Sequence, residues 1–459
     1  MSGGPLLLGL DVGTTRMKAL LMGHDGEPRR SSTAPTPFTT SDQTSEMAVE
    51  AMLEAVAGLL ADLGDDLEQV EAVGVAGLAE SGAPLDGSGR ALAPVIAWHD
   101  PRGEEPVKRL NEHFGDELAG RIGQPLRTVS SVAKLGWLLD QGVGGIRRWL
   151  GVPELCLFHL TGRQATEHSL AARTGAYHVV ERAYMPDVAD VVGFDPEVLA
   201  PVLQAGSVMG RVSSEGAGWS GLRAGIPVTV AGHDHAVGAE GIGAGPRDVA
   251  NSVGTAETLI RRTPVAPDMG KALELRTAVT VRPGGEEWVV LASAARAGLV
   301  LEAAAGSLGH SLAELDDLAE EAEEAGADAP EVSDEAVRSI QSGDPPELPD
   351  APPGEVWNGL LRALCERTFE SATRSAELLG PADRLVVFGG GSGSDRWMRT
   401  KATMADLPVF RSCAPDVVAH GAACFAGMAA GAWGSVTEAP TVPVDEVPVD
   451  EVPGQEVKA

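Results

Sequence analysis

Apolar runs of strand length alternate with amphipathic stretches along most of the chain. Residues 5–11 are apolar up to Asp11, and a Gly-Thr-Thr turn, a second apolar run at 17–22 and an Asp-Gly turn follow. This pattern predicts a β-hairpin. Residues 46–63 have apolar positions at helical spacing and predict a helix, while 70–78 reads as a buried strand. Strands interleaved with helices indicate α/β layers.

The same pattern begins again in the middle of the chain. After the apolar run 226–232, residues 248–263 show a strand pattern interrupted by a second Gly-Thr turn. Residues 356–379 predict a long amphipathic helix, which leads to an apolar strand and a glycine-rich loop at 384–395. Two strand–Gly-Thr–strand units in one chain predict two similar lobes.

The expected division is an N-terminal lobe over 1–243 and a C-terminal lobe over 244–434. Within the second lobe, 312–354 is acidic and predicts one short helix followed by a Pro/Asp-rich connector. Residues 435–459 contain PVDEV twice in succession and have no aromatic residue. That composition predicts a disordered tail.

The charge balance narrows the choice of partners. The 459 residues include 35 Lys plus Arg and 66 Asp plus Glu, a net charge of −31. Such a field repels nucleic acid and anionic membranes, so neither is expected as a partner. A phosphate-bearing ligand would have to be held locally, by backbone N–H groups and a metal ion. No apolar run reaches the roughly 18 residues of a membrane span and no signal peptide is evident, so a cytoplasmic location is expected.

The first candidate for phosphate chemistry is the segment Asp11-Val12-Gly13-Thr14-Thr15. An acid at a strand end can hold a metal ion through water, and a turn of Gly and Thr supplies backbone and hydroxyl donors to phosphate oxygens. A plain hairpin turn would show the same residues, so the motif alone leaves both interpretations open.

Two further glycine-bearing turns follow apolar strands. One contains Gly254 and Thr255, and the other is the run Gly389-Gly390-Gly391. Glycine lets a backbone approach a phosphate or nucleoside closely. A glycine-rich loop often merely connects two elements, but the repetition after buried strands favours a nucleotide site.

Asp234 lies directly after the buried strand 226–232, between His233 and His235. A carboxylate in this position could accept the proton of a substrate hydroxyl that attacks a phosphoryl group. It could equally cap the following helix. The two histidines have no third ligand in view, which favours packing or substrate contact over a metal pair.

A polar cluster accompanies the strand-like run 95–98. Glu80 and Ser81 precede the run, and His99, Asp100 and Arg102 follow it. Polar groups that converge beside an apolar wall can select a polyhydroxylated molecule. Each of them could also be an ordinary surface or structural residue.

In this order the motifs resemble those of the FGGY carbohydrate kinases, which include xylulokinases, gluconokinases and glycerol kinases. The resemblance is colinear from about residue 6 to 432. The matching segments are 9–26, 85–103, 134–140, 160–179, 224–245, 248–257, 384–410 and 416–427.

The resemblance implies an α/β fold of two actin-like (RNase H-like) lobes, with mixed β-sheets flanked by helices and a cleft between the lobes. It implies ATP and Mg²⁺ as cofactors, a small sugar or polyol as substrate, and a homodimer. Asp234 would be the catalytic base, with Asp11 and Asp234 at the metal and Glu80, Ser81, Arg102, Asp234 and His235 at the substrate. The nucleotide would be held by Asp11, Gly13, Thr14, Thr15, Gly254, Thr255, Gly390, Gly391 and Asp395.

Three departures from the family pattern bear on the substrate. The loop 77–81 reads GLAES, where xylulokinases have a sequence like GQMHG; Glu80 falls where glycerol kinases have a substrate-binding Glu, but without the Arg beside it. A GER-P loop is missing from the second lobe. Glu257 follows the second Gly-Thr turn, where an acid would disfavour a triphosphate unless it points away.

The sequence is therefore interpreted as an ATP-dependent kinase that phosphorylates a hydroxyl of a small sugar or polyol, with a xylulokinase-like pentulose kinase as the first expectation. A polyol- or glycerol-type kinase, a sugar-acid kinase and a degenerate, non-catalytic sugar- or nucleotide-binding relative remain as alternatives. An actin- or chaperone-like ATPase shares the phosphate turns, but the segments 85–103 and 160–179 oppose it.

Overall fold

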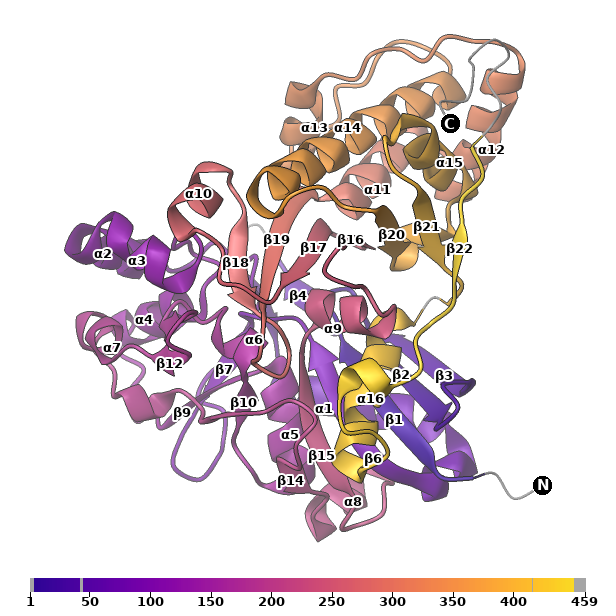
Figure 1. The fold of residues 1–459 in the computed structure, drawn as a ribbon. Helices are drawn as coiled ribbons and strands as arrows, with labels where there is room; N and C mark the ends of the chain where they lie inside the picture. The colour runs from indigo at the N-terminus through magenta and orange to yellow at the C-terminus, as the bar shows by residue number, and fades with distance from the viewer. Residues whose placement is uncertain (1–3, 42–43, 415, 450–459) are drawn as a thin grey trace. The chain divides into compact units, whose positions relative to one another are not determined.

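The computed structural model describes residues 4–41, 44–414 and 416–449 and divides into two compact units (Figure 1). Of the described residues, unit 1 contains 4–41, 44–243, 262–290 and 416–442, and unit 2 contains 244–261, 291–414 and 443–449. The chain therefore passes from one unit to the other at several points, and the boundary expected at 243/244 is one of them. The sequence pattern did not indicate that 262–290 and 416–442 pack with unit 1.

Unit 1 is built on a six-stranded mixed sheet with the order β14-β15-β6-β1-β2-β3. The predicted hairpin is present: β1 (Leu6–Val12) pairs antiparallel with β2 (Arg16–Gly23). On the other side of β1, β6 (Val70–Gly77) and then β15 (Pro227–His233) run parallel to it. The edges are β3 (Pro28–Pro35) and β14 (Gly210–Arg211). Three parallel strands thus end at the same edge of the sheet.

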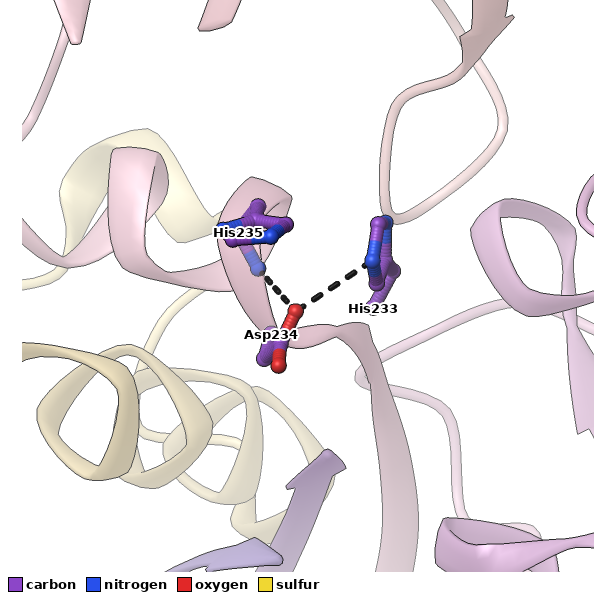
Figure 2. A group of neighbouring side chains, drawn as sticks. All are labelled: His233, Asp234 and His235. Atoms are coloured by element: carbon purple, nitrogen blue, oxygen red, sulfur yellow. Dashed lines mark hydrogen bonds and ion pairs between the residues drawn. The ribbon is translucent and has the colours of Figure 1, made fainter. Parts of the chain in front are cut away.

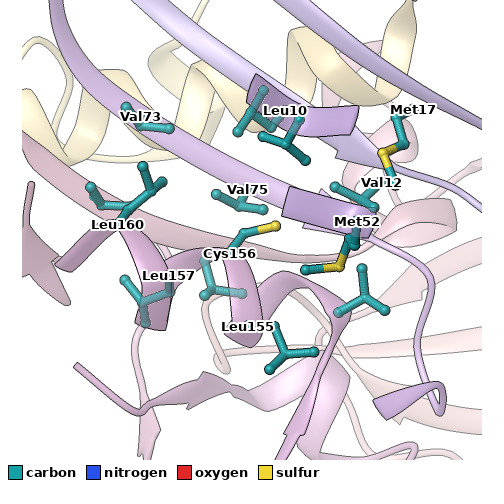
Figure 3. Close-up of a cluster of buried hydrophobic side chains, with 14 of the residues drawn as sticks. Leu10, Val12, Met17, Met52, Val73, Val75, Leu155, Cys156, Leu157 and Leu160 are labelled. Carbon is teal, nitrogen blue, oxygen red and sulfur yellow. The ribbon is translucent and has the colours of Figure 1, made fainter. Parts of the chain in front are cut away.

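Both faces of this sheet are covered, because β1 is apolar at nearly every position. Leu10 joins a core with α1 (Val49–Asp62) and α5 (Val152–Thr161), where Met52 and Cys156 pack (Figure 3). Leu7 joins a separate core with α16 (Val417–Ala430) on the opposite face. Side chains alternate between the faces of a strand, so a continuous apolar run is the pattern expected for a strand buried on both sides.

Helix α16 approaches the sheet so closely that two strand positions must be glycine. A Cβ atom at Gly74 would lie 1.9 Å from the carbonyl oxygen of Ala422, and one at Gly9 would lie 1.8 Å from that of Ala419. These distances are far shorter than any real carbon–oxygen contact. The glycines therefore let the backbone of α16 rest on β1 and β6, which explains why 416–442 belongs to unit 1.

A five-stranded sheet in unit 1, with the order β4-β5-β8-β7-β9, supports the loops that contain the polar cluster. Its strands are β4 (Thr39–Thr40), β5 (Ser45–Met47), β8 (Val95–Ile96), β7 (Gly82–Leu85) and β9 (Arg148–Gly151). Residues 78–81 connect β6 of the main sheet to β7, and residues 97–100 follow β8. Both loops are therefore anchored by a strand.

A seven-stranded sheet repeats the hairpin of unit 1. β16 (Asp248–Val253) pairs antiparallel with β17 (Glu257–Thr263) and parallel with β20 (Arg384–Phe388). The full strand order is β18-β19-β17-β16-β20-β21-β22, and the remaining strands are β18 (Ala278–Val281), β19 (Trp288–Ala295), β21 (Val409–Ser412) and β22 (Val444–Glu446). The second Gly-Thr turn joins β16 to β17, as predicted.

Helices of unit 2 pack into one core with this sheet. The predicted long helix is α14 (Pro353–Leu379), which buries Trp357 and Leu364. The acidic stretch differs from the prediction of one helix, because it forms α12 (Leu312–Glu324) and also α13 (Asp334–Gln341). Ser333 caps α13, which buries Val337 and Ile340. One apolar position per turn is enough for a short helix that packs against others.

Residues 435–449 differ from the disorder that their composition predicted. β22 pairs antiparallel with β21, and three valines and the alanine of this segment are buried: Val436, Ala439, Val442 and Val447. Apolar residues spaced between prolines and acids supply a narrow buried edge that composition alone does not reveal. The rest of the predicted tail, 450–459, lies outside the described residues.

Among the helices of the described ranges, none has both the length and the apolar character that crossing a bilayer requires.

We predict that Gly74→Ala destabilises the protein by at least about 2 kcal/mol, because the new methyl group would force α16 away from the sheet. Gly58→Ala, in the middle of α1, is the matched control: nothing lies within 4 Å of its Cβ position, and the helix should gain up to about 1 kcal/mol. Urea unfolding of both variants measures the difference. Equal stabilities would contradict the packing described.

Candidate active site

Asp11 and Asp234 lie at the same edge of the main sheet in unit 1. Asp11 is opposite Ala76 in the register of β1 with β6, and His233 is opposite Gly77 in the register of β15 with β6. Asp234 follows immediately, so the two acids project from strand ends two strands apart, a backbone separation of about 10 Å. The sequence predicted both acids at strand ends, and the topology brings them together.

The Asp11 carboxylate is buried and poorly satisfied. Its Oδ1 atom has no hydrogen-bond partner among the described residues. The pKa of Asp11 is raised to about 8, mainly by burial and in part by the charges of Asp234 and Asp416, against the opposing effect of Lys18. Lys18 itself pairs with Asp416 at 3.2 Å. A buried, unpaired carboxylate beside other acids is costly to the fold and suits a position that a cation occupies.

The turn after Asp11 is held in place by residues from other loops. Thr36 donates its hydroxyl to the Gly13 carbonyl at 2.7 Å and its N–H to the Thr15 carbonyl at 3.0 Å. The indole N–H of Trp98 donates to the Thr14 hydroxyl at 3.0 Å. The predicted phosphate turn therefore has a fixed backbone.

Asp234 is the first residue of α9 (Asp234–Gly241), directly after the end of β15 (Figure 2). Its Oδ1 accepts the backbone N–H of His235 at 2.6 Å and lies 3.2 Å from Nε2 of His233. The N-cap residue of α9 is His233, so the capping role weighed for Asp234 does not apply. The carboxylate keeps 21% of its side-chain surface exposed.

The two histidines flank this carboxylate closely. Their rings are in edge-to-face contact with centroids 5.2 Å apart. Burial, together with the charges of His235 and Arg173, holds the pKa of His233 well below its usual range, so the His233 ring is neutral. Ligand atoms of His233, Asp234 and His235 lie within 4.8 Å of one another in the described part of the chain. The third polar group beside the two histidines is thus Asp234, which lies between them in the sequence.

Behind Asp234, the end of β15 is fixed by a buried serine and glutamate. The backbone N–H of His233 donates to the Ser169 hydroxyl at 2.9 Å, and Ser169 in turn donates to the Glu167 carboxylate. Gly232 has φ +134°, and a Cβ there would lie 2.7 Å from the Ser169 oxygen. Burial raises the pKa of Glu167 to about 8.

Sequence reasoning missed Ser169 and Glu167 as supports of Asp234. The only available signal was their place in the segment 160–179, because their contact with β15 joins residues 64 positions apart. Both are fully buried. They act on Asp234 through the backbone of His233.

Glu80 lies at the same edge, three residues beyond β6. Its side chain is 8% exposed and its φ is +69°, which is unusual for a residue with a side chain. Its carboxylate forms an ion pair with Arg173 at 2.6 Å. Burial raises the pKa of Glu80 against the effect of Arg173, and Asp234 raises it further. The sequence identified Glu80 but missed Arg173, which comes from a distant loop.

Two other predicted substrate residues, Ser81 and Arg102, form hydrogen bonds and ion pairs with neighbouring protein residues. The Ser81 hydroxyl is fully buried and accepts a hydrogen bond from the backbone N–H of Trp98 at 2.8 Å. The Arg102 guanidinium forms two hydrogen bonds to Asp100, at 2.8 and 2.6 Å, and an ion pair with Glu46 at 2.6 Å. These contacts stabilise the loops beside β8, so the polar cluster is partly structural.

In unit 2, the second Gly-Thr turn is closed by a hydrogen bond from the Gly254 N–H to the Ala256 carbonyl at 3.0 Å. The acid that follows, Glu257, is fully buried. It pairs with Lys401 at 2.6 Å and accepts the Thr368 hydroxyl at 2.8 Å. Glu257 therefore points into the core of unit 2, which removes the concern that it would repel a phosphate at the turn.

The glycine-rich loop of unit 2 also packs closely. Gly389 has φ +100°, and a Cβ at Gly391 would lie 2.5 Å from Cγ1 of Val253. A Cβ at Gly390 would meet no described atom within 4 Å. Asp395 opens α15 (Asp395–Met404), is mostly exposed and pairs with Arg411. Gly390 and Asp395 are thus the accessible members of this predicted group.

Comparison with known proteins identifies the class of protein to which this chain belongs. A likeness of fold is found with solved sugar kinases: a ligand-bound xylulose kinase from Lactobacillus acidophilus has a TM-score of 0.82 at 18% identity, covering 96% of this chain and 93% of that one. The L-fuculokinase of Escherichia coli (strain K12) is 24% identical over 453 residues, 95% of this chain and 94% of its own. The xylulose kinase of Streptomyces rubiginosus is 27% identical over 441 residues, 92% and 87% of the two chains.

Two models of one family match most of the chain. The N-terminal domain of the FGGY family of carbohydrate kinases matches residues 6–241, and its C-terminal domain matches residues 250–430. The chain belongs to the FGGY family of carbohydrate kinases. The resemblance, the actin-like α/β fold and the class of enzyme, a phosphotransferase with an alcohol acceptor, are thereby confirmed.

We predict that Ser169→Ala lowers kcat about tenfold or more, because the strand end that holds Asp234 loses a fixed hydrogen bond and small misplacements of a catalytic group are costly. Its KM for MgATP should stay near the wild-type value. Ser220→Ala is the matched control, since this buried serine also makes two hydrogen bonds, to Gly216 and Leu222, away from Asp234. Equal kcat values for the two variants, at similar loss of stability, would rule out the positioning role.

A second prediction concerns the buried ion pair of unit 2. Lys401→Met should destabilise the protein by about 3–5 kcal/mol, because the Glu257 carboxylate is left buried and uncompensated. Adding Glu257→Gln to this variant should restore much of the loss. Urea unfolding of the single and double variants measures the coupling, and additive losses would refute it.

Proposed function

We propose that the protein transfers the terminal phosphoryl group of ATP to a hydroxyl of a small sugar or polyol, with Asp234 as the general base. The observation that supports this most is the convergence of Asp11 and Asp234 at one sheet edge, through strands β1, β6 and β15. The Asp11 carboxylate would bind the metal ion that accompanies the phosphates. The Asp234 carboxylate would accept the proton of the attacking alcohol.

Asp234 is suited to the role of base by its surroundings. It is the first residue of a helix after a buried strand, it remains partly exposed, and its position is fixed through Ser169 and His233. The neutral His233 ring beside it leaves its negative charge uncompensated. A carboxylate held in this way can accept the proton of a bound hydroxyl as that oxygen attacks phosphorus.

A magnesium ion fits the residues present. Asp11 offers a buried carboxylate oxygen without a partner in the described ranges, and Asp234 faces the same edge; carboxylate oxygens are ligands that Mg²⁺ prefers. When bound, Mg²⁺ neutralises charge on the transferring phosphoryl group. We infer that Asp11 and Asp234 hold this ion, directly or through water. A chain with a net charge of −31 needs such a local device to bind a polyphosphate.

Each unit contains a glycine-bearing turn to which we assign a nucleotide-binding role. In unit 1, Gly13, Thr14 and Thr15 form a fixed turn beside Asp11. Backbone and hydroxyl donors of this kind suit phosphate oxygens. We assign the same role in unit 2 to the turn of Gly254 and Thr255, and the adenosine to the segment with Gly390, Gly391 and Asp395.

The acceptor is a small polyhydroxylated molecule. A pentulose, as in the xylulose kinases that the chain resembles, is our first expectation, and a deoxyketohexose or a polyol such as glycerol is the alternative. Glu80, Asp234 and His235 line the same part of unit 1 and are the proposed substrate contacts. Ser81 and Arg102 would act there by holding the loops.

We predict that Asp234→Asn lowers substrate-dependent ADP release by about 10²–10⁴-fold, because the general base is lost. ATP binding, measured by titration calorimetry, should be largely retained. The control is Asp190→Asn, an exposed acid in α7 (Pro186–Val192), which should behave as wild type. Undiminished phosphorylation by the Asp234 variant would remove this residue from its role. ATP binding with no ADP release by the wild type on any sugar or polyol would favour a non-catalytic binder.

A further inference from the structure

The Glu80–Arg173 pair has features of a site built for a ligand. Glu80 is one of three non-glycine residues with positive φ in the described ranges. Such a conformation costs free energy and persists where the surrounding structure enforces it, often at functional sites. Here the Ser131 hydroxyl donates to the Glu80 carbonyl at 3.3 Å, and the Glu80 side chain is turned toward Arg173.

Arg173 is held from two sides. One guanidinium nitrogen lies 2.6 Å from the Glu80 carboxylate, and another donates to Oε1 of Gln124. The side chains of Arg173 and Glu80 are 14% and 8% exposed. The Nε–H of Arg173 is buried and has no partner among the described residues. A fixed donor therefore lies beside a fixed acceptor.

This pair lies at the edge that contains the proposed base. Glu80 continues from β6, the strand between those of Asp11 and Asp234, and the Leu78 N–H donates to the Val12 carbonyl at 3.0 Å. The charge of Asp234 acts on Glu80, and that of Arg173 acts on His233. A molecule that contacts Glu80 and Arg173 is thus near Asp234.

The lysine and arginine side chains around this edge already form ion pairs or hydrogen bonds with other protein groups. Arg173 pairs with Glu80 and Lys18 pairs with Asp416. Arg102 is paired with two acids, Asp100 and Glu46, and the buried Lys134 ammonium donates to the carbonyls of Asp100 and Arg102. Neither Asp11 nor Asp234 has a Lys or Arg ion pair in the described part of the chain. The local charge is therefore negative.

We propose that Glu80 and Arg173 together read hydroxyl groups of the substrate, and that the substrate is an uncharged polyhydroxylated molecule, not a sugar acid or a sugar phosphate. This inference rests on the proposed kinase function. A hydroxyl can donate to the Glu80 carboxylate and accept from Arg173, whereas a carboxylate can only accept. An anionic substrate would also meet Glu80, Asp234 and Asp11 without a free cation to pair with.

The test is a panel of matched acceptors with the full-length protein. ADP release is measured with MgATP and either neutral alditols and ketoses or the aldonates of the same carbon number. The neutral set should support turnover and the aldonates should not. Turnover with aldonates alone would overturn the inference and leave the kinase function standing. No turnover with either set would overturn the kinase function, and the inference with it.

Two variants then test the pair itself. Glu80→Gln should raise the KM for the neutral acceptor tenfold or more while the KM for MgATP is unchanged, and it should release Arg173, so that aldonates become competitive inhibitors or substrates. Arg173→Lys keeps the ion pair but removes the Nε donor, and it should raise the acceptor KM without admitting aldonates. Thermal unfolding and ATP binding show that each variant is folded. An unchanged acceptor KM in both folded variants would overturn the assignment.

Discussion

The site depends on the repulsion between acids that the fold holds together at one edge of a sheet. The parallel strands β1, β6 and β15 end together, and each has an acid of the candidate site close to its end: Asp11 is the next-to-last residue of β1, Glu80 lies three residues beyond β6, and Asp234 directly follows β15. Burial raises the pKa of Asp11, and the charge of Asp234 adds to this. Such an arrangement is unfavourable by itself and favourable when a cation and a polyphosphate are bound.

The packing of the sheet offsets the unfavourable free energy of holding these acids close together. Apolar strands are covered on one face by α1 and α5 and on the other by α16, which contacts β1 and β6 through Gly9 and Gly74. The serine and glutamate behind β15 fix the last residue before Asp234. Proteins commonly keep a costly functional group in place through well-packed surroundings of this kind.

Much of the fold could be predicted because local patterns are strong. The buried strand expected at 70–78 is β6 over 70–77, and the helix expected at 46–63 is α1 over 49–62. The prediction was poorer where apolar residues are sparse, as for α13 and β22. Membership of 262–290 and 416–442 in unit 1 depends on contacts between distant segments, which periodicity does not report.

For the site, the sequence indicated the acids at strand ends and the glycine turns, because these residues stand out next to apolar runs. It could not indicate which polar residues meet across the fold. Arg173 pairs with Glu80 over 93 positions of sequence (173 minus 80), and Ser169 supports His233 over 64. Arg102 and Ser81 were predicted as substrate contacts, and the structure shows them bound to neighbouring loops. Residue type alone does not distinguish these two outcomes.

The central claim is that Asp11 and Asp234 serve one site, the first at the metal and the second at the alcohol. The most direct measurement is a crystal structure of the full chain with Mn²⁺, a non-hydrolysable ATP analogue and a neutral alditol, with Mn²⁺ located by its anomalous scattering. We expect a Mn²⁺ peak beside the Asp11 carboxylate and an alditol hydroxyl within hydrogen-bond distance of Asp234. A metal and an acceptor bound without contact to either carboxylate would contradict it.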